Sequence, residues 1–196
     1  MNELGKKIDK ISNQLTDLRW EIWTKHSLFT WQWWMLLGLC IVASILFIIL
    51  IKKEKLVQTI AYFGIIFILN KYIDEIATAL DWYDYRIQVQ PGIIPSMLVA
   101  NLFIIPMALS IIYQRYSKWK PFLIALGLFS VFTSYVALFF LKIVGIYLEK
   151  SWNAHWSCIS LVVMAVIAKI VIDRVVLIQA HTNGDQSNSD PSSPIT

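Results

Sequence analysis

Several polar and charged side chains interrupt an otherwise apolar segment between residues 56 and 80. They are Asn70, Lys71, Asp74 and Glu75. On a helix, Lys71 lies three residues from Asp74 and four from Glu75, so the lysine can neutralise either carboxylate. The two carboxylates point about 100° apart, so they do not both face the same partner. Because a charge inside a membrane helix costs from about 2.5 kcal/mol, this cluster is a candidate functional site.

Two residues from other apolar segments are candidate partners of this cluster. Asn101 should lie at the depth of Asn70 and form a hydrogen bond to it across two helices. Lys142 should lie near the carboxylates and form a second ion pair. The whole set is either structural, with lysines that extend to the interface, or the wall of a solvated cavity for a small polar ligand or a proton.

Other polar groups do not form a recognisable catalytic or metal site. Lys169 and Asp173 are four residues apart and indicate a helix end anchored in lipid headgroups. The chain has no Walker A, G-x-G-x-x-G, H-E-x-x-H, G-x-S-x-G or C-x-x-C motif. We therefore expect a protein that is not an enzyme, with no catalytic residue, no cofactor and no bound metal.

The composition places these residues in a membrane protein. Of the 196 residues, 57% are hydrophobic and only 15% are charged, which is more apolar than a soluble domain of this size. The net charge of +4 comes from short basic clusters between apolar runs. Such clusters are typical of orienting charges, so we expect the lipid bilayer as partner and no nucleic acid.

The apolar runs predict an all-α, polytopic bundle of five transmembrane helices. A hydrocarbon core of about 30 Å needs about 20 apolar residues in a helix. The predicted spans cover about 33–51, 56–80, 93–113, 122–147 and 156–178, within a transmembrane domain of residues 31–178. Residues 179–196 are rich in Ser, Asn, Asp and Pro, and we expect a disordered cytoplasmic tail there.

An amphipathic helix is predicted for residues 1–30, ahead of the first span. Its apolar residues recur at alternating spacings of four and three, which places them on one face. These residues are Leu4, Ile8, Ile11, Leu15, Leu18 and Ile22. The pattern favours an interfacial helix on the membrane surface over a short coiled coil with another chain.

Basic loops and tryptophans predict the orientation. The loops after the first and third spans carry Lys52, Lys53, Lys55, Arg115, Lys118 and Lys120. The positive-inside rule then places the N-terminus outside and the C-terminus in the cytoplasm of a multi-pass cell-membrane protein, although the N-terminal region is also basic. The tryptophans expected to anchor the two interfaces are Trp33, Trp34, Trp82, Trp119, Trp152 and Trp156.

Four segments of the chain form a recognisable pattern: RWEIWTKHSLFTWQWW from Arg19, YIDEIATAL from Tyr72, IIYQRYSKWKPFLIA from Ile111 and GIY from Gly145. In their order and spacing they resemble an uncharacterised family of small multi-span membrane proteins of endospore-forming Gram-positive bacteria. The resemblance implies location and architecture but no activity. Positions 138 and 139 hold Leu and Phe where the family pattern has a Glu-Pro pair.

The expected function follows from large apolar surfaces and missing catalytic motifs. We expect a non-enzymatic membrane protein that acts through protein or lipid contacts, as a sensor, scaffold or assembly factor. Its partner would be a second copy of the chain or another membrane protein. The alternative is a small transporter, or a protein that binds a polar ligand or proton through Asn70, Lys71, Asp74 and Glu75.

Overall fold

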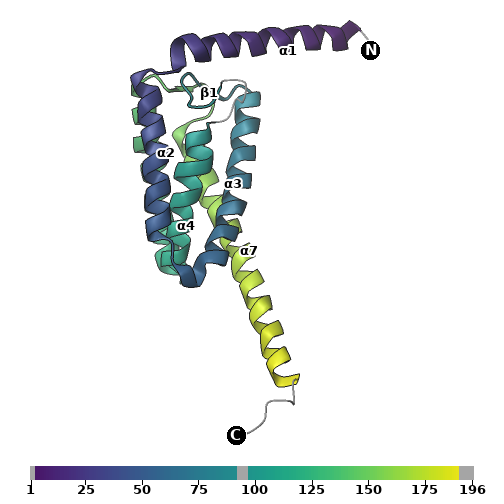
Figure 1. The fold of residues 1–196 in the computed structure, drawn as a ribbon, viewed down its shortest axis with the longest axis vertical. Helices are drawn as coiled ribbons and strands as arrows, with labels where there is room; N and C mark the ends of the chain where they lie inside the picture. Colours follow the sequence, from purple (N-terminus) through teal and green to yellow (C-terminus); the bar gives the residue numbers. More distant parts are fainter. Residues whose placement is uncertain (1–2, 92–96, 190–196) are drawn as a thin grey trace.

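The computed structural model describes residues 3–91 and 97–189. Long helices α2, α3 and α7 pack with shorter helical segments into one bundle, and helix α1 lies across one end of it (Figure 1). The elements in chain order are α1 Glu3–Ile22, π-helix η1 Trp23–Ser27, α2 Trp31–Leu50, 3-10 helix η2 Lys53–Lys55, α3 Leu56–Ala79, β1 Tyr83–Tyr85, π-helix η3 Val99–Ile104, α4 Ile105–Arg115, α5 Trp119–Val131, π-helix η4 Phe132–Ala137, α6 Leu138–Ile143, β2 Tyr147–Glu149 and α7 Ala154–Ser189.

Three helical stretches within the described residues are long and apolar enough to cross a membrane. They are Trp31–Leu50, Lys53–Ala79 and Trp119–Ile143. A fourth stretch, Val99–Arg115, is apolar but shorter. The fold is therefore mostly helical, as predicted, while helix length and composition alone give three membrane-length helices and not five.

The third predicted span, 93–113, differs most from the structure. Its first four residues lie outside the described part of the chain, and the first helical residue described is Leu98. The helix then runs as η3 and α4 to Arg115. The backbone N–H of Met97, the residue just before this helix, is buried and donates a hydrogen bond to Asp74 on α3.

The fourth and fifth predicted spans also end differently. The fourth, 122–147, ends at Ile143 because Gly145 adopts a left-handed conformation with φ +73° and the chain then enters β2. The fifth, 156–178, continues as α7 to Ser189, so the helix includes much of the segment for which we expected disorder. Residues 179–189 contain no proline, so none of them is barred from a helix by a missing backbone N–H. Residues 190–196 lie outside the described residues.

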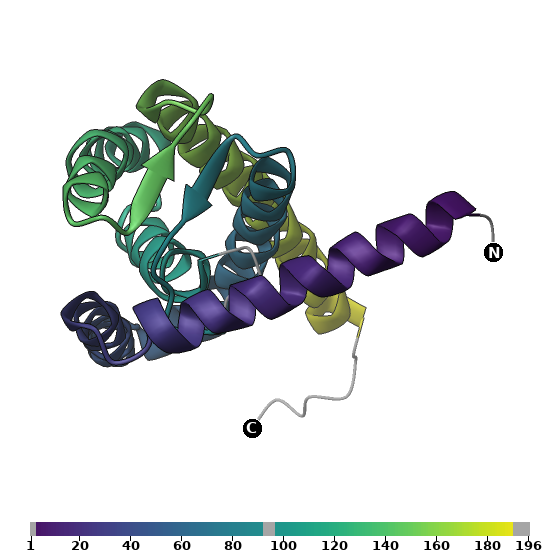
Figure 2. The same cartoon turned by 90° about the horizontal axis from the view of Figure 1, so that it is seen from above.

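A small antiparallel sheet closes one end of the bundle, which the sequence did not predict. Strands β1 and β2 pair Tyr83 with Glu149 and Tyr85 with Tyr147. Figure 2 shows both strands lying over the ends of the helices, beside α1. The sheet therefore joins the loop after α3 to the loop after α6.

The larger core cluster lies where α3, α4, α5 and α7 meet. Its fully buried members include Tyr62, Leu109, Phe122 and Ala165. The hydroxyl of Tyr62 donates a hydrogen bond to the backbone oxygen of Ala165 over 3.0 Å. Small residues on α7 allow this close approach of the two helices, as is common in membrane bundles.

The outer surface of the bundle is strongly apolar. On α2 only Leu36 and Cys40 are buried, whereas Ile41, Ile48 and Ile49 are more than half exposed. Water-soluble monomers rarely expose so continuous an apolar surface. A hydrocarbon environment is the natural surrounding for it.

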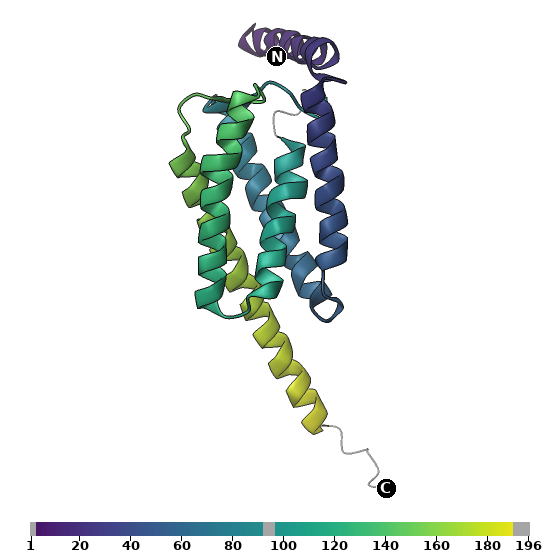
Figure 3. The same cartoon turned by 90° about the vertical axis from the view of Figure 1, so that its left-hand side faces the viewer.

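The predicted tryptophans gather at the two ends of the bundle. Trp33 and Trp34 lie in the first turn of α2, and Trp82 stacks on Trp152 with ring centroids 5.3 Å apart. Trp156 follows in the first turn of α7, at the same end. Trp119 starts α5 at the opposite end (Figure 3).

Candidate functional site

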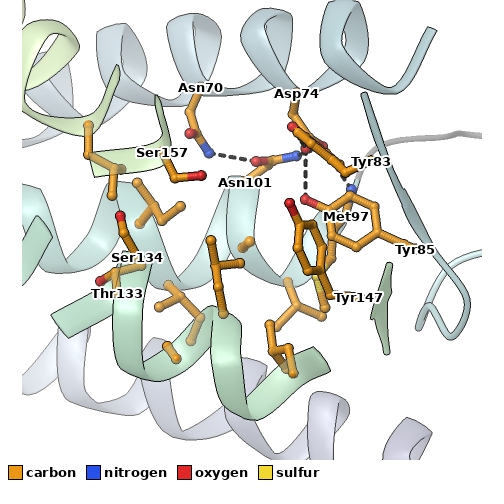
Figure 4. A pocket seen from close by; sticks show the side chains of 18 of the residues that line it. Asn70, Asp74, Tyr83, Tyr85, Met97, Asn101, Thr133, Ser134, Tyr147 and Ser157 are labelled. Atoms are coloured by element: carbon orange, nitrogen blue, oxygen red, sulfur yellow. Dashed lines mark hydrogen bonds between the residues drawn. The ribbon is translucent and has the colours of Figure 1, made fainter. Parts of the chain in front are cut away.

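Asp74 is the centre of a buried hydrogen-bond network. Its side chain accepts four hydrogen bonds, two on each oxygen (Figure 4). The hydroxyls of Tyr83 and Tyr85 donate to Oδ1 over 2.6 and 2.8 Å. The backbone N–H of Met97 and the side-chain amide of Asn101 donate to Oδ2 over 3.0 and 2.5 Å. The residue is only 4% exposed.

The local structures explain why these groups meet. Asn70 and Asp74 are four residues apart on α3 and therefore share its inward face. Tyr83 and Tyr85 alternate on β1, so both side chains leave the strand on the same side. Asp74 also bonds the free N–H of Met97, just before the helix that leads into η3, which places a carboxylate where the helix dipole favours negative charge.

Asn101 links the two polar residues of α3. The amide of Asn70 donates to Oδ1 of Asn101 over 2.5 Å, and Asn101 in turn donates to Asp74. The hydrogen bond expected between Asn70 and Asn101 is therefore present. Its role is broader than expected, because it continues to the carboxylate and forms a chain of three side chains.

The two lysines of the predicted cluster lie outside this network. Lys71 pairs with Glu75 on the outer face of α3, where their side chains are 37% and 34% exposed. Lys142 pairs with Glu149 over 2.8 Å and not with a carboxylate of α3, so that prediction was wrong. The helical angle of about 100° between neighbours turns Glu75 outward while Asp74 faces the bundle.

A cavity of about 310 Å³ lies next to Asp74. Its polar lining comes from six elements and includes Asn70, Asp74, Tyr83, Tyr85, Asn101, Thr133, Ser134, Tyr147, Ser157 and Ser160. The remaining lining is mostly aliphatic and aromatic. Cavities of this size and character are the usual form of small-molecule sites.

Two π-helical segments form opposite parts of the cavity wall. Asn101 belongs to η3, and Thr133 and Ser134 belong to η4. Short π-helical turns within α-helices occur frequently at functional sites. The Ser134 hydroxyl is buried and has no hydrogen-bond partner among the residues described. A bound molecule would satisfy it.

The tyrosines around Asp74 are held in their protonated form. Burial, followed by the negative charge of Asp74, raises the pKa of Tyr83 and of Tyr85 well above the usual value for a phenol. Burial, followed by the charge of Glu149, likewise raises the pKa of Tyr147. These phenols therefore act as hydrogen-bond donors at neutral pH.

A second polar cluster lies at the opposite end of the bundle. Lys169 is 1% exposed, and its ammonium lies 2.9 Å from Oδ2 of Asp173 and 3.1 Å from the backbone oxygen of Ser117. It also lies over the rings of Tyr113 and Trp119, at 5.0 and 5.1 Å from their centroids. Lys169 is thus a buried structural group and not the headgroup anchor that the sequence indicated.

Sequence reasoning identified Asn70, Asp74 and Asn101 but missed the tyrosines and the serine. The alternation of Tyr83 and Tyr85 directly after the second apolar run is a signal that would have pointed to a short strand. Nothing in the local sequence marks the π-helical turns that carry Asn101 and Ser134. Among the described residues, no group of three or more His, Cys, Asp or Glu side chains is placed to hold a metal ion.

The fold and site define a helical protein with membrane-length helices and a mostly apolar internal cavity that ends on a buried carboxylate. No protein-family model, no curated protein and no solved structure matches the chain. The family resemblance noted from the sequence therefore stays a prediction, and the site alone supports the function proposed next.

Proposed function

We propose that this protein is a non-enzymatic, multi-pass membrane protein that binds a small amphiphilic molecule in the cavity beside Asp74. The observation that carries this proposal is the cavity of about 310 Å³, which combines apolar walls with one hydrogen-bonding end. Amphiphilic molecules have the same division of polar and apolar surface. Binding of such a molecule supports a role as a sensor or a carrier.

The rim of the cavity supports entry from the bilayer. Leu39, Phe132 and Phe140 line the cavity, and each is also at least 40% exposed on the outside of the bundle. An apolar opening of this kind faces lipid when the bundle lies in a membrane. A molecule dissolved in the bilayer can then enter sideways without crossing water.

The membrane topology that best fits this proposal has five crossings. We count two further crossings besides the three membrane-length helices. One is η3 with α4, which is shorter, and the other is the apolar first part of α7; both lie beside the long helices in the bundle (Figure 3). The basic residues between α2 and α3 and between α4 and α5 lie at the end opposite α1. The positive-inside rule then supports an outer end that carries α1 and the sheet, with α7 leading into the cytoplasm.

Photolabelling of the full-length protein in lipid nanodiscs tests the ligand site. The probe is a dodecanol analogue with a diazirine in its chain, and mass spectrometry locates the labelled peptides. We expect labelling of η4 and of the start of α7, and we expect Ala137→Trp to suppress it, because Ala137 lines the cavity. Val131→Trp is the matched control, since Val131 is exposed and does not line the cavity. Equal labelling of both variants and the wild type would disprove the site.

A further inference from the structure

Asp74 has no cationic partner in the described chain. The nearby lysines are paired elsewhere, Lys71 with Glu75 and Lys142 with Glu149. Lys169 lies at the other end of the bundle, with Asp173. Among the residues that line the cavity, Asp74 is the one carboxylic acid, and no basic residue is present.

When Asp74 is ionised, it gives the cavity a negative potential that no cation of the described chain offsets. Charges inside membrane proteins normally pair with an opposite charge, because an unpaired buried ion is costly. In a low-dielectric surrounding the attraction of a cation extends over several ångströms. A positively charged ligand would therefore supply the counter-charge that the protein lacks.

The hydrogen bonds that Asp74 already accepts favour a cation that donates no hydrogen bond. A carboxylate has about four acceptor positions, and here Tyr83, Tyr85, Met97 and Asn101 fill four. A cation that approaches this group is attracted by charge and does not need to form a hydrogen bond to it. A quaternary ammonium has no N–H to donate and meets this condition.

Aromatic side chains next to Asp74 suit the same head group. Tyr83, Tyr85 and Tyr147 all line the cavity and pack against one another, with ring centroids 5.4 to 5.8 Å apart. Trp152 lines it as well. Clusters of aromatic rings attract alkylammonium groups through their π electrons.

We propose that the ligand of this cavity is an amphiphile with a quaternary ammonium head, which lies beside Asp74 and the tyrosines while its apolar chain extends toward Leu39 and Phe132. This inference rests on the proposed function and specifies the ligand of the same site. The cavity thus selects its ligand by charge as well as by polarity.

Competition against the diazirine dodecanol probe, in nanodiscs of neutral lipid, tests the charge preference. The competitors are dodecyltrimethylammonium and its neutral carbon isostere, in which a tert-butyl group replaces the trimethylammonium group. For the wild type we expect the cation to compete at a concentration at least about tenfold lower than the isostere. Asp74→Asn should remove this difference, and Glu75→Gln, the matched control on the outer face of α3, should preserve it.

A second pair of variants covers the case in which Asp74→Asn does not fold. Ser134→Lys places a cation in the cavity and should abolish the preference, whereas the neutral Ser134→Met should retain it. Equal competition by the cation and the isostere in the wild type would overturn the charge inference and leave the amphiphile site intact. Failure of both compounds, together with probe labelling that Ala137→Trp does not change, would instead overturn the proposed function.

Discussion

The side-chain amide of Asn101 donates a hydrogen bond to Oδ2 of Asp74 over 2.5 Å, although the two residues lie on different helices. The same side chain accepts from Asn70. One asparagine therefore connects the polar face of α3 to the π-helical start of the next helix. All three side chains of this connection line the cavity.

Loss of Asn101 should destabilise the protein. Asn101→Leu removes a donor from Asp74 and leaves the Asn70 amide without its partner, so we expect a loss of about 1–3 kcal/mol. Thermal unfolding of the protein in detergent measures the change. Asn13→Leu is the control for the substitution itself, because Asn13 is exposed on α1, a helix without buried residues. A melting temperature unchanged by Asn101→Leu would show that water replaces these hydrogen bonds at no cost.

Lys71 should couple to Glu75 and not to Asp74. Both side chains of the Lys71–Glu75 pair are about one-third exposed, so the pair should contribute less than about 1 kcal/mol. We expect a double-mutant cycle of Lys71→Met with Glu75→Gln to give a small favourable coupling. The parallel cycle with Asp74→Asn should give none within error. Strong coupling in the second cycle would contradict the separation of the two carboxylates.

Sequence patterns predicted mainly the part of the polar site that lies on α3. The four-residue spacing placed Asn70 and Asp74 on one face, and the depth of Asn101 brought it to the same level. The pattern did not decide which carboxylate faces inward, because that depends on how α3 packs against its neighbours. We predicted that Lys142 pairs with a carboxylate of α3, but its partner is Glu149. Glu149 lies on β2, a strand that the periodicity of the sequence did not indicate.

The fold, too, was predictable where local sequence determines it and not where contacts distant in sequence do. Apolar runs located α2 and α3 within a few residues, because hydrophobic length alone determines such segments. The helix that contains Asn101 begins later than predicted, and its start is set by a side chain distant in sequence, Asp74. Long-range capping of this kind cannot be predicted from local spacing.

The buried Lys169 should contribute to the stability of the opposite end of the bundle. Lys169→Met removes an ion pair, a hydrogen bond to Ser117 and contacts with aromatic rings, and leaves Asp173 without its cation. Because Asp173 keeps a hydrogen bond from Tyr113 and is about one-third exposed, we expect a loss of about 1–3 kcal/mol. Adding Asp173→Asn should recover part of this loss. If the double variant is as unstable as the sum of the two single variants, the pair is not a functional unit of the fold.

Five crossings predict that the two ends of the chain lie on opposite sides of the membrane. A cysteine introduced at Asn2 should react with an impermeant maleimide added to intact cells, in a background where Cys40 and Cys158 are replaced by Ala. A cysteine at Ser189 should react only after permeabilisation. Labelling of both positions from the same side would require an even number of crossings and would exclude this topology.

Helix α1 should lie on the membrane surface with its apolar face in the lipid. It has no buried residue, and Leu4, Ile8 and Ile11 are more than half exposed on one face. The helix lies across the end of the bundle, which is the direction of a membrane plane around vertical spans (Figure 1). Lys6 and Lys10 lie on its polar face and Lys7 lies beside the apolar face, and all three favour anionic headgroups.

Hydrogen exchange of the full-length protein in nanodiscs with anionic lipid tests this placement. We expect slow exchange over residues 3–22 in the wild type, because the amides are helical and the apolar face is covered. Replacing both Ile11 and Leu18 by Asp should make exchange of this segment much faster without changing α3. The control replaces Lys6 and Asn13, on the polar face, by Asp and should keep most of the protection. Fast exchange in the wild type would mean that the bilayer does not cover α1, whereas protection that persists in lipid-free detergent and rises with protein concentration would identify a second copy of the chain as its partner.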